Sequence, residues 1–175
     1  MSFKLDPGLV ELHKRGGGSV FPVDGGFDLY NMYGVSYVLV AVDCGFEVRS
    51  YERAEEPSRD YSGTDLLAVQ RQLSINLGAN YRDHERRAGR TIATVRLPGK
   101  QDQVKAGYRL VFEPTLGVRL ARDDGSIVPF GQGPYNNHLL VRYSYVADVP
   151  LELIIESLMD PGGAPLFSEF LERDT

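Results

Sequence analysis

The stretch YRDHERRAGR, residues 81–90, gathers four arginines and one of the three histidines of an otherwise acidic chain. Guanidinium groups bind phosphates and carboxylates, so the stretch is a candidate site for nucleic acid, phosphate or an acidic protein segment. If it is helical, Asp83 pairs with Arg86 and Arg87 at spacings of three and four. Much of the positive charge is then neutralised locally.

The same helical spacing pairs Arg82 with Glu85. The remaining excess charge lies near Gly89, where a helix C-terminus would favour cations. A structural explanation therefore suffices for most of the stretch. Three arginines remain candidates for binding an acidic protein partner, with phosphate or nucleic acid as the alternative: Arg86, Arg87 and Arg90.

A second candidate contact lies at the end of the chain. Its apolar side chains have the spacing of one face of a short helix: Leu166, Phe167, Phe170 and Leu171. A two-turn helix is not stable alone, so this face must dock. It docks either on the chain's own body or in a groove of a neighbouring subunit, which the glycine-rich hinge DPGGAP would allow it to reach.

The sequence predicts no metal site and no cofactor. The histidines (His13, His84 and His138) and Cys44 have no paired spacing, and HERRA lacks the second histidine of a zinc-binding helix. The G-x-S-x-G turn and the dinucleotide fingerprint are both missing.

Two weaker features remain on the chemical side. Cys44 follows Asp43, whose carboxylate would raise the thiol pKa and so disfavour a nucleophile. Asp123 and Asp124 resemble an acid/base pair, but Gly125 makes a hairpin turn the simpler interpretation. Ten tyrosines and no tryptophan favour either core packing or an aromatic contact surface.

Charge and composition exclude several classes. A net charge of −5 with a pI near 5.2 disfavours a general nucleic-acid binder. The negative charge belongs to residues 148–175, which sum to −6. The longest nearly apolar run, residues 35–42, is too short to span a membrane. One cysteine and no signal-peptide pattern predict a cytoplasmic protein that is not secreted.

Three helices have clear sequence signals. Asp6 and Pro7 begin the first, which Gly16 ends. The second begins in capping-box spacing at Ser62 and Asp65 and reaches residue 88. Its apolar stripe comprises Leu66, Val69, Leu73, Leu77 and Tyr81. The third follows Pro150.

Most other segments predict strands. Residues 33–42 and 46–53 form a hairpin, and 116–130 form another around the Asp-Asp-Gly turn. Strands are also expected at 91–97, 108–114 and 138–146. The glycine-rich segment 16–27 is predicted to be a loop, and 52–63 a surface connection.

These elements predict an α+β fold: a single domain over residues 1–160, with an antiparallel or mixed sheet of about six to seven strands and helices mainly on one face. Residues 161–175 form the amphipathic tail. The function favoured is a non-catalytic protein-protein interaction or assembly subunit, with self-association through the tail and the arginines as one form. The alternatives are a small-molecule enzyme or ligand-binding domain with a pocket at the sheet edge that involves Arg142, His138 or His84, and a nucleic-acid-associated protein.

Overall fold

The structure is a computed structural model, and it describes residues 3–53, 56–115, 117–131 and 137–172. Within these described residues, eight strands form one sheet in the order β1-β2-β3-β4-β5-β9-β8-β7, and every pairing between them is antiparallel. The strands are β1 (Gly18–Val23), β2 (Gly26–Asn31), β3 (Ser36–Val42), β4 (Gly45–Tyr51), β5 (Ser58–Gly63), β7 (Tyr108–Glu113), β8 (Gly117–Arg122) and β9 (Ile127–Gly131). A separate small sheet pairs β6 (Thr94–Val95) with β10 (Leu171–Glu172).

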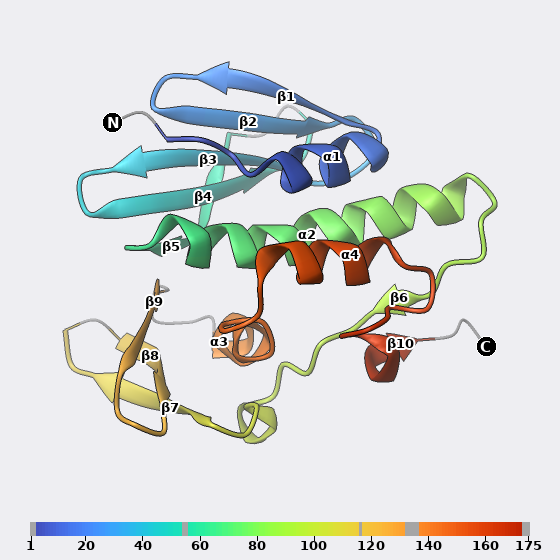
Figure 1. The fold of residues 1–175 in the computed structure, drawn as a ribbon. Helices are drawn as coiled ribbons and strands as arrows, with labels where there is room; N and C mark the ends of the chain where they lie inside the picture. The colour runs from blue at the N-terminus through green and yellow to red at the C-terminus, as the bar shows by residue number, and fades with distance from the viewer. Residues whose placement is uncertain (1–2, 54–55, 116, 132–136, 173–175) are drawn as a thin grey trace.

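In the described part of the chain, the helices are α1 (Pro7–Arg15), α2 (Leu66–Arg87), α3 (Asn137–Ser144) and α4 (Leu151–Met159). Short 3₁₀ turns lie at Gln101–Gln103 and Ser168–Phe170. Figure 1 shows α2 crossing the centre of the molecule, with α1 and α4 beside it. The predicted α+β class and the antiparallel sheet are confirmed.

The predicted strand number of six to seven is too low. The segment expected to be a loop contains the β1–β2 hairpin, and the expected surface connection contains β5. Glycines in the first segment hid its alternation. Gly18 is needed for close approach, because a Cβ there would lie 2.2 Å from the His13 ring. Gly25 has a φ of 71° at the hairpin turn, which favours glycine.

Helix α2 forms where its apolar stripe predicts, but the predicted capping box is wrong: Ser62 lies in β5, and Asp65 is itself the N-cap. The Asp65 carboxylate accepts hydrogen bonds from the backbone amides of Leu67 and Ala68 at 3.4 and 3.1 Å. The helix ends at Arg87 with Ala88 as its C-cap, and Gly89 follows with a φ of 80°. The stripe at positions 69, 73, 77 and 81 is buried in the core beneath the sheet.

Two expected strands are wrong or much shorter. Residues 138–146 do not form a strand, because Asn137–Ser144 is the helix α3. Its buried residues Leu140, Val141, Tyr143 and Ser144 fit a helical face rather than alternation. Only Thr94–Val95 of the strand expected at 91–97 is paired.

The tail packs on the chain's own body. Phe167 is 1% exposed and belongs to the main core, and Leu166 and Phe170 pack against that core. Leu171 lies in β10 opposite Val95. The expected helix is a single 3₁₀ turn followed by this strand, and the tail's last three residues, 173–175, lie outside the described residues.

Candidate functional site: an arginine groove over helix α2

A groove of about 810 Å³ lies over the C-terminal half of α2. We call it the arginine groove, because six arginines and two acidic side chains line it among the residues that the structure describes. Its charged residues are Arg53, Arg82, Arg86, Arg87, Arg96, Arg142, Glu52 and Asp83. The lining therefore carries an excess of four positive charges in a protein whose net charge is −5.

The floor of the groove is one face of α2. The helix contributes eight lining residues whose spacing repeats with the helical period: Ile75, Asn76, Ala79, Asn80, Arg82, Asp83, Arg86 and Arg87. This face is mostly polar and faces away from the buried stripe. A polar helix face is ordinarily interpreted as solvated surface, so no local pattern indicates that neighbouring segments rise beside it.

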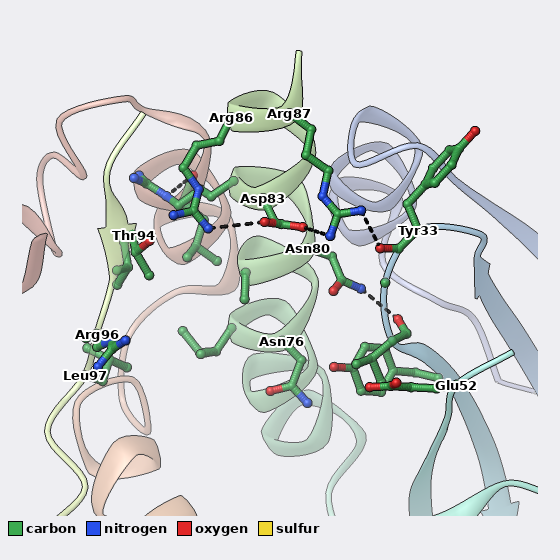
Figure 2. Close-up of a pocket in the computed structure, with 18 of the residues that line it drawn as sticks. Tyr33, Glu52, Asn76, Asn80, Asp83, Arg86, Arg87, Thr94, Arg96 and Leu97 are labelled. Atoms are coloured by element: carbon green, nitrogen blue, oxygen red, sulfur yellow. Dashed lines mark hydrogen bonds and ion pairs between the residues drawn. The ribbon is translucent and has the colours of Figure 1, made fainter. Parts of the chain in front are cut away.

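Asp83 holds two of the groove arginines. One carboxylate oxygen lies 3.2 Å from Arg86 Nη2, and the other lies 2.6 Å from Arg87 Nη2. Figure 2 shows the carboxylate between the two guanidinium groups. The predicted pairing at spacings of three and four is confirmed. It restricts the rotamers of two long side chains and so lowers the entropy cost of binding an anion there.

Arg82 does not form the predicted surface pair with Glu85. Its guanidinium is buried and donates hydrogen bonds to backbone carbonyls of Ser157, Leu158 and Asp160 at the end of α4, and to that of Ala93. Burial lowers the pKa of Arg82 from its usual value. Its role in the groove is therefore to fix the floor to α4.

One wall is the β2–β3 turn, which α2 clamps in place. Asn80 Nδ2 donates to the Val35 carbonyl at 2.8 Å, and Arg87 Nη1 donates to the Tyr33 carbonyl at 3.0 Å (Figure 2). Within the turn, the Tyr33 amide donates to Asn31 Oδ1 at 3.0 Å. The turn presents two large side chains to solvent at the rim, Met32 and Tyr33, which are 63% and 60% exposed. Exposed, rigidly held aromatic and methionine side chains are typical of protein interfaces.

The opposite wall comprises residues 94–97, beside α3. Arg96 pairs with Glu172 of the tail at 2.8 Å, and both side chains are more than half exposed. Arg142 reaches the groove from α3. The acidic tail therefore contacts an arginine of its own chain, and the expected contact between the tail of one subunit and the arginines of another stays a prediction.

Arg53 lies on the rim with a φ of 54°, the one positive value among the described non-glycine residues. That backbone conformation costs a residue with a Cβ free energy, of order 1 kcal/mol. Such outliers are found preferentially at functional sites.

The structure places only some of the predicted contact residues in the groove. Arg86 and Arg87 line the groove. Arg90 lies outside it and pairs at 2.5 Å with Glu85, which is nearly buried. The tail residues 166, 167, 170 and 171 pack as described above, and their role in partner binding stays a prediction. The sequence reasoning did not select Asn80, Arg96 or Arg53.

Of the residues weighed for chemistry, His138 and Arg142 lie one turn apart on α3. Arg142 lines the groove, whereas His84 and His138 lie outside it. Cys44 is exposed in the β3–β4 turn. Asp124 accepts a hydrogen bond from the Ser126 amide at 2.8 Å, as expected of a hairpin turn. Within the part of the chain that the structure describes, three or more potential ligands do not gather into a group that would hold a metal ion.

Comparison with known proteins identifies the family. Residues 12–166 match the family model described as Immunity protein 61. The chain belongs to this immunity-protein family. The matched range includes every residue that lines the arginine groove.

A solved structure of Rv3902c from M. tuberculosis resembles the chain with a TM-score of 0.75 at 20% sequence identity. The likeness covers 97% of this chain and 96% of that one, and it shows a shared fold. No curated protein matches.

Membership in an immunity-protein family supports a protein-interaction role, as the sequence favoured, and implies a protein partner. Among the residues described, helices that are both long and apolar enough to cross a membrane do not occur.

Proposed function

We propose that this chain is an immunity protein that binds a protein toxin and neutralises it, with the arginine groove and the Met32–Tyr33 rim as the binding surface. The observation that carries the proposal is the family match over residues 12–166. The predicted cytoplasmic location is part of the proposal, since an immunity protein must act where it meets its toxin.

The groove supports the choice of surface. It combines a charged, partly preordered floor with two exposed anchors on a clamped turn. Arginine and aromatic or sulfur-containing side chains are enriched at interface centres, because they bury large area and pair with polar groups. Neutralisation then requires only occlusion of the toxin, so the groove needs no catalytic group.

The experiment begins with affinity capture by the purified chain from cells of its source organism, followed by identification of the captured protein. That protein is then expressed in a host cell, alone and together with the chain. We expect growth arrest in the first case and growth in the second. A captured protein that is harmless alone, or that arrests growth in both cases, contradicts the proposal.

Substitutions at the rim test whether the groove is the binding surface, and a substitution elsewhere is the matched control. Met32→Ser with Tyr33→Ser removes both exposed side chains of the rim and leaves the backbone hydrogen bonds of the turn. We expect at least a tenfold weaker complex and loss of rescue, because large side chains that become buried in a complex dominate its binding energy. Phe112→Ser removes a large side chain that is 73% exposed on β7, outside the groove, and should rescue growth fully.

The alternative function, binding of a small molecule, is tested on the same purified chain. Although the groove volume falls within the range of ligand pockets, its lining is rich in charge, whereas such pockets are mostly apolar. Native mass spectrometry of the chain purified without its toxin should therefore give the mass of the polypeptide alone. A stoichiometric adduct lost on Arg142→Gln would favour the ligand-binding alternative.

A further inference from the structure

The arginine groove is also specific about the chemistry of its occupant. We infer that the groove binds an extended, acidic segment of the protein partner, with carboxylates received between the α2 arginines and the wall formed by Arg96 and Arg142. This inference rests on the proposed function, because it names the part of the toxin that the groove would hold.

Charge complementarity is the first argument. The lining has six arginines and two acids, and one of those acids, Asp83, is already engaged by two arginines. Among the described residues, Arg142 makes no ion pair, and Arg96 shares one with the exposed Glu172. An incoming carboxylate would thus meet arginines that are already charged and ordered, or that need only exchange an exposed partner.

Dimensions give the second argument. The α2 residues that line the groove run from Ile75 to Arg87, a rise of about 18 Å at about 1.5 Å per residue. An extended chain advances about 3.3 Å per residue, so the floor accommodates about five or six residues. This fits a linear segment better than a single free anion.

The surroundings distinguish a protein segment from nucleic acid. The whole chain is acidic, and the tail beside Arg96 carries Glu169 and Glu172, which would repel a continuous phosphate backbone. Met32 and Tyr33 at the rim add apolar area that suits side chains flanking an acidic run. A polypeptide with a short acidic stretch is compatible with both features.

The binding test uses a fluorescein-labelled peptide of six glutamates, its six-glutamine counterpart and a six-nucleotide thymidine oligomer, all measured by fluorescence anisotropy at low and at physiological salt. We expect the full chain to bind the glutamate peptide at least tenfold more tightly than the glutamine peptide, with weakening at higher salt. Equal binding of the two peptides overturns the inference. Tighter binding of the oligomer than of the glutamate peptide also overturns it.

Charge reversal on the wall locates the binding. Arg96→Glu with Arg142→Glu should weaken binding of the glutamate peptide at least tenfold. The matched control, Lys14→Glu with Arg109→Glu, changes the total charge by the same amount at exposed positions outside the groove. It should change the affinity for the glutamate peptide less than twofold. Equal weakening by both variants would show attraction by overall charge alone and would overturn the inference. Circular dichroism of both variants verifies that they are folded.

The two proposals fail separately. If the wild-type chain and its Arg96→Glu/Arg142→Glu variant rescue cells from the captured toxin equally well, the acidic-segment inference is wrong and the immunity function stands. If the groove binds the glutamate peptide as expected but the captured protein is not toxic, the immunity function is wrong and the groove's preference for acidic segments stands.

Discussion

Arg82 Nε donates to the Leu158 carbonyl oxygen at 3.0 Å and so ties the C-terminal part of α2 to the last turn of α4. The last carbonyls of a helix lack intrahelical partners, and the same guanidinium also donates to the carbonyls of Ser157 and of Asp160, the C-cap of α4. The contact is close because Gly78 lies opposite Leu158, where a Cβ would approach the leucine side chain within 2.6 Å. Arg82 therefore holds the floor of the groove against the helix beneath it.

Arg82→Met should lower the free energy of unfolding by about 3 kcal/mol, because the carbonyls lose a charged donor while the stem is retained. The melting temperature should fall by about 6–12 °C for a chain of this length. Urea unfolding followed by circular dichroism measures the free energy of unfolding, and thermal unfolding followed in the same way measures the melting temperature. Arg15→Met is the control, since Arg15 pairs with Glu11 on the surface and should change little. Equal stability of the two variants would contradict the assigned role of Arg82.

Local signals explain which parts of this arrangement could be predicted. The stripe that includes Leu73 predicts α2, and spacing along that helix predicts that Asp83 pairs with its arginine neighbours. The capping-box pattern places the N-cap three residues too early, at Ser62 instead of Asp65. Arg82 was assigned to the surface because its partners on α4 lie 75 or more positions away, beyond any local pattern.

The wrong strand and the unpredicted groove residues also depend on contacts between distant segments. In residues 138–146, Val141, Tyr143 and Tyr145 alternate as in a strand, yet packing buries a helical face instead. The groove itself joins the β2–β3 turn, α2, residues 94–97 and α3. Segments so far apart in the sequence meet only through the fold, so sequence could propose Arg86 and Arg87 but not their neighbours.

His13 should make the fold sensitive to mild acid. Its Nε2 lies 3.2 and 3.0 Å from the carbonyl oxygens of Ser19 and Tyr30, so it is the protonated nitrogen of a neutral ring, and Nδ1 is buried without a hydrogen-bond partner. Burial lowers the pKa of His13 below 6.5, against smaller opposing effects of these carbonyls and Asp28. The unfolded chain therefore binds the proton more readily, and stability should fall as pH drops below about 6.5.

The measurement is the free energy of unfolding at pH 7.5, 6.5 and 5.5 for the wild type and His13→Gln. The glutamine can donate to the same carbonyls but cannot titrate, so its stability should decline less over this range. His138→Gln serves for comparison, because the pKa of His138 is also lowered, by partial burial and Arg142. If the free energy of unfolding of His13→Gln depended on pH as steeply as that of the wild type, His13 would have the same pKa in the folded and unfolded states.

Asp148 should titrate far below an ordinary aspartate. Arg122 Nη2 lies 2.7 Å from one carboxylate oxygen, and Tyr108 donates its hydroxyl proton to the other. Hydrogen bonding from Arg122 is the main cause that lowers the pKa of Asp148 to about 2. NMR titration of the Asp148 side chain should place its midpoint near that value in the wild type and higher in Arg122→Gln. A midpoint that Arg122→Gln leaves in place would contradict the ion pair.

The clamp on the β2–β3 turn can be weakened without disturbing the core. Asn80→Ala removes the bond to the Val35 carbonyl, and we expect a loss of about 1 kcal/mol in unfolding free energy. The larger effect should be on order in the turn: amide hydrogen exchange at Tyr33 and Gly34 should accelerate, while exchange in the β3–β4 hairpin stays unchanged. Exchange that is unaltered in the turn would show that Arg87 alone holds it.

Phe167 decides what the tail contributes to the fold. Because its ring is 1% exposed and packs in the main core, Phe167→Ala should lower the free energy of unfolding by about 3 kcal/mol or more. Phe170 is only partly buried and meets the Tyr145 ring edge-on at 5.2 Å, so Phe170→Ala should cost clearly less. Urea unfolding gives both values, and light scattering gives the mass of each variant. A Phe167→Ala protein as stable as the wild type would place the ring outside the core, where it would be available to the partner that the amphipathic pattern predicts.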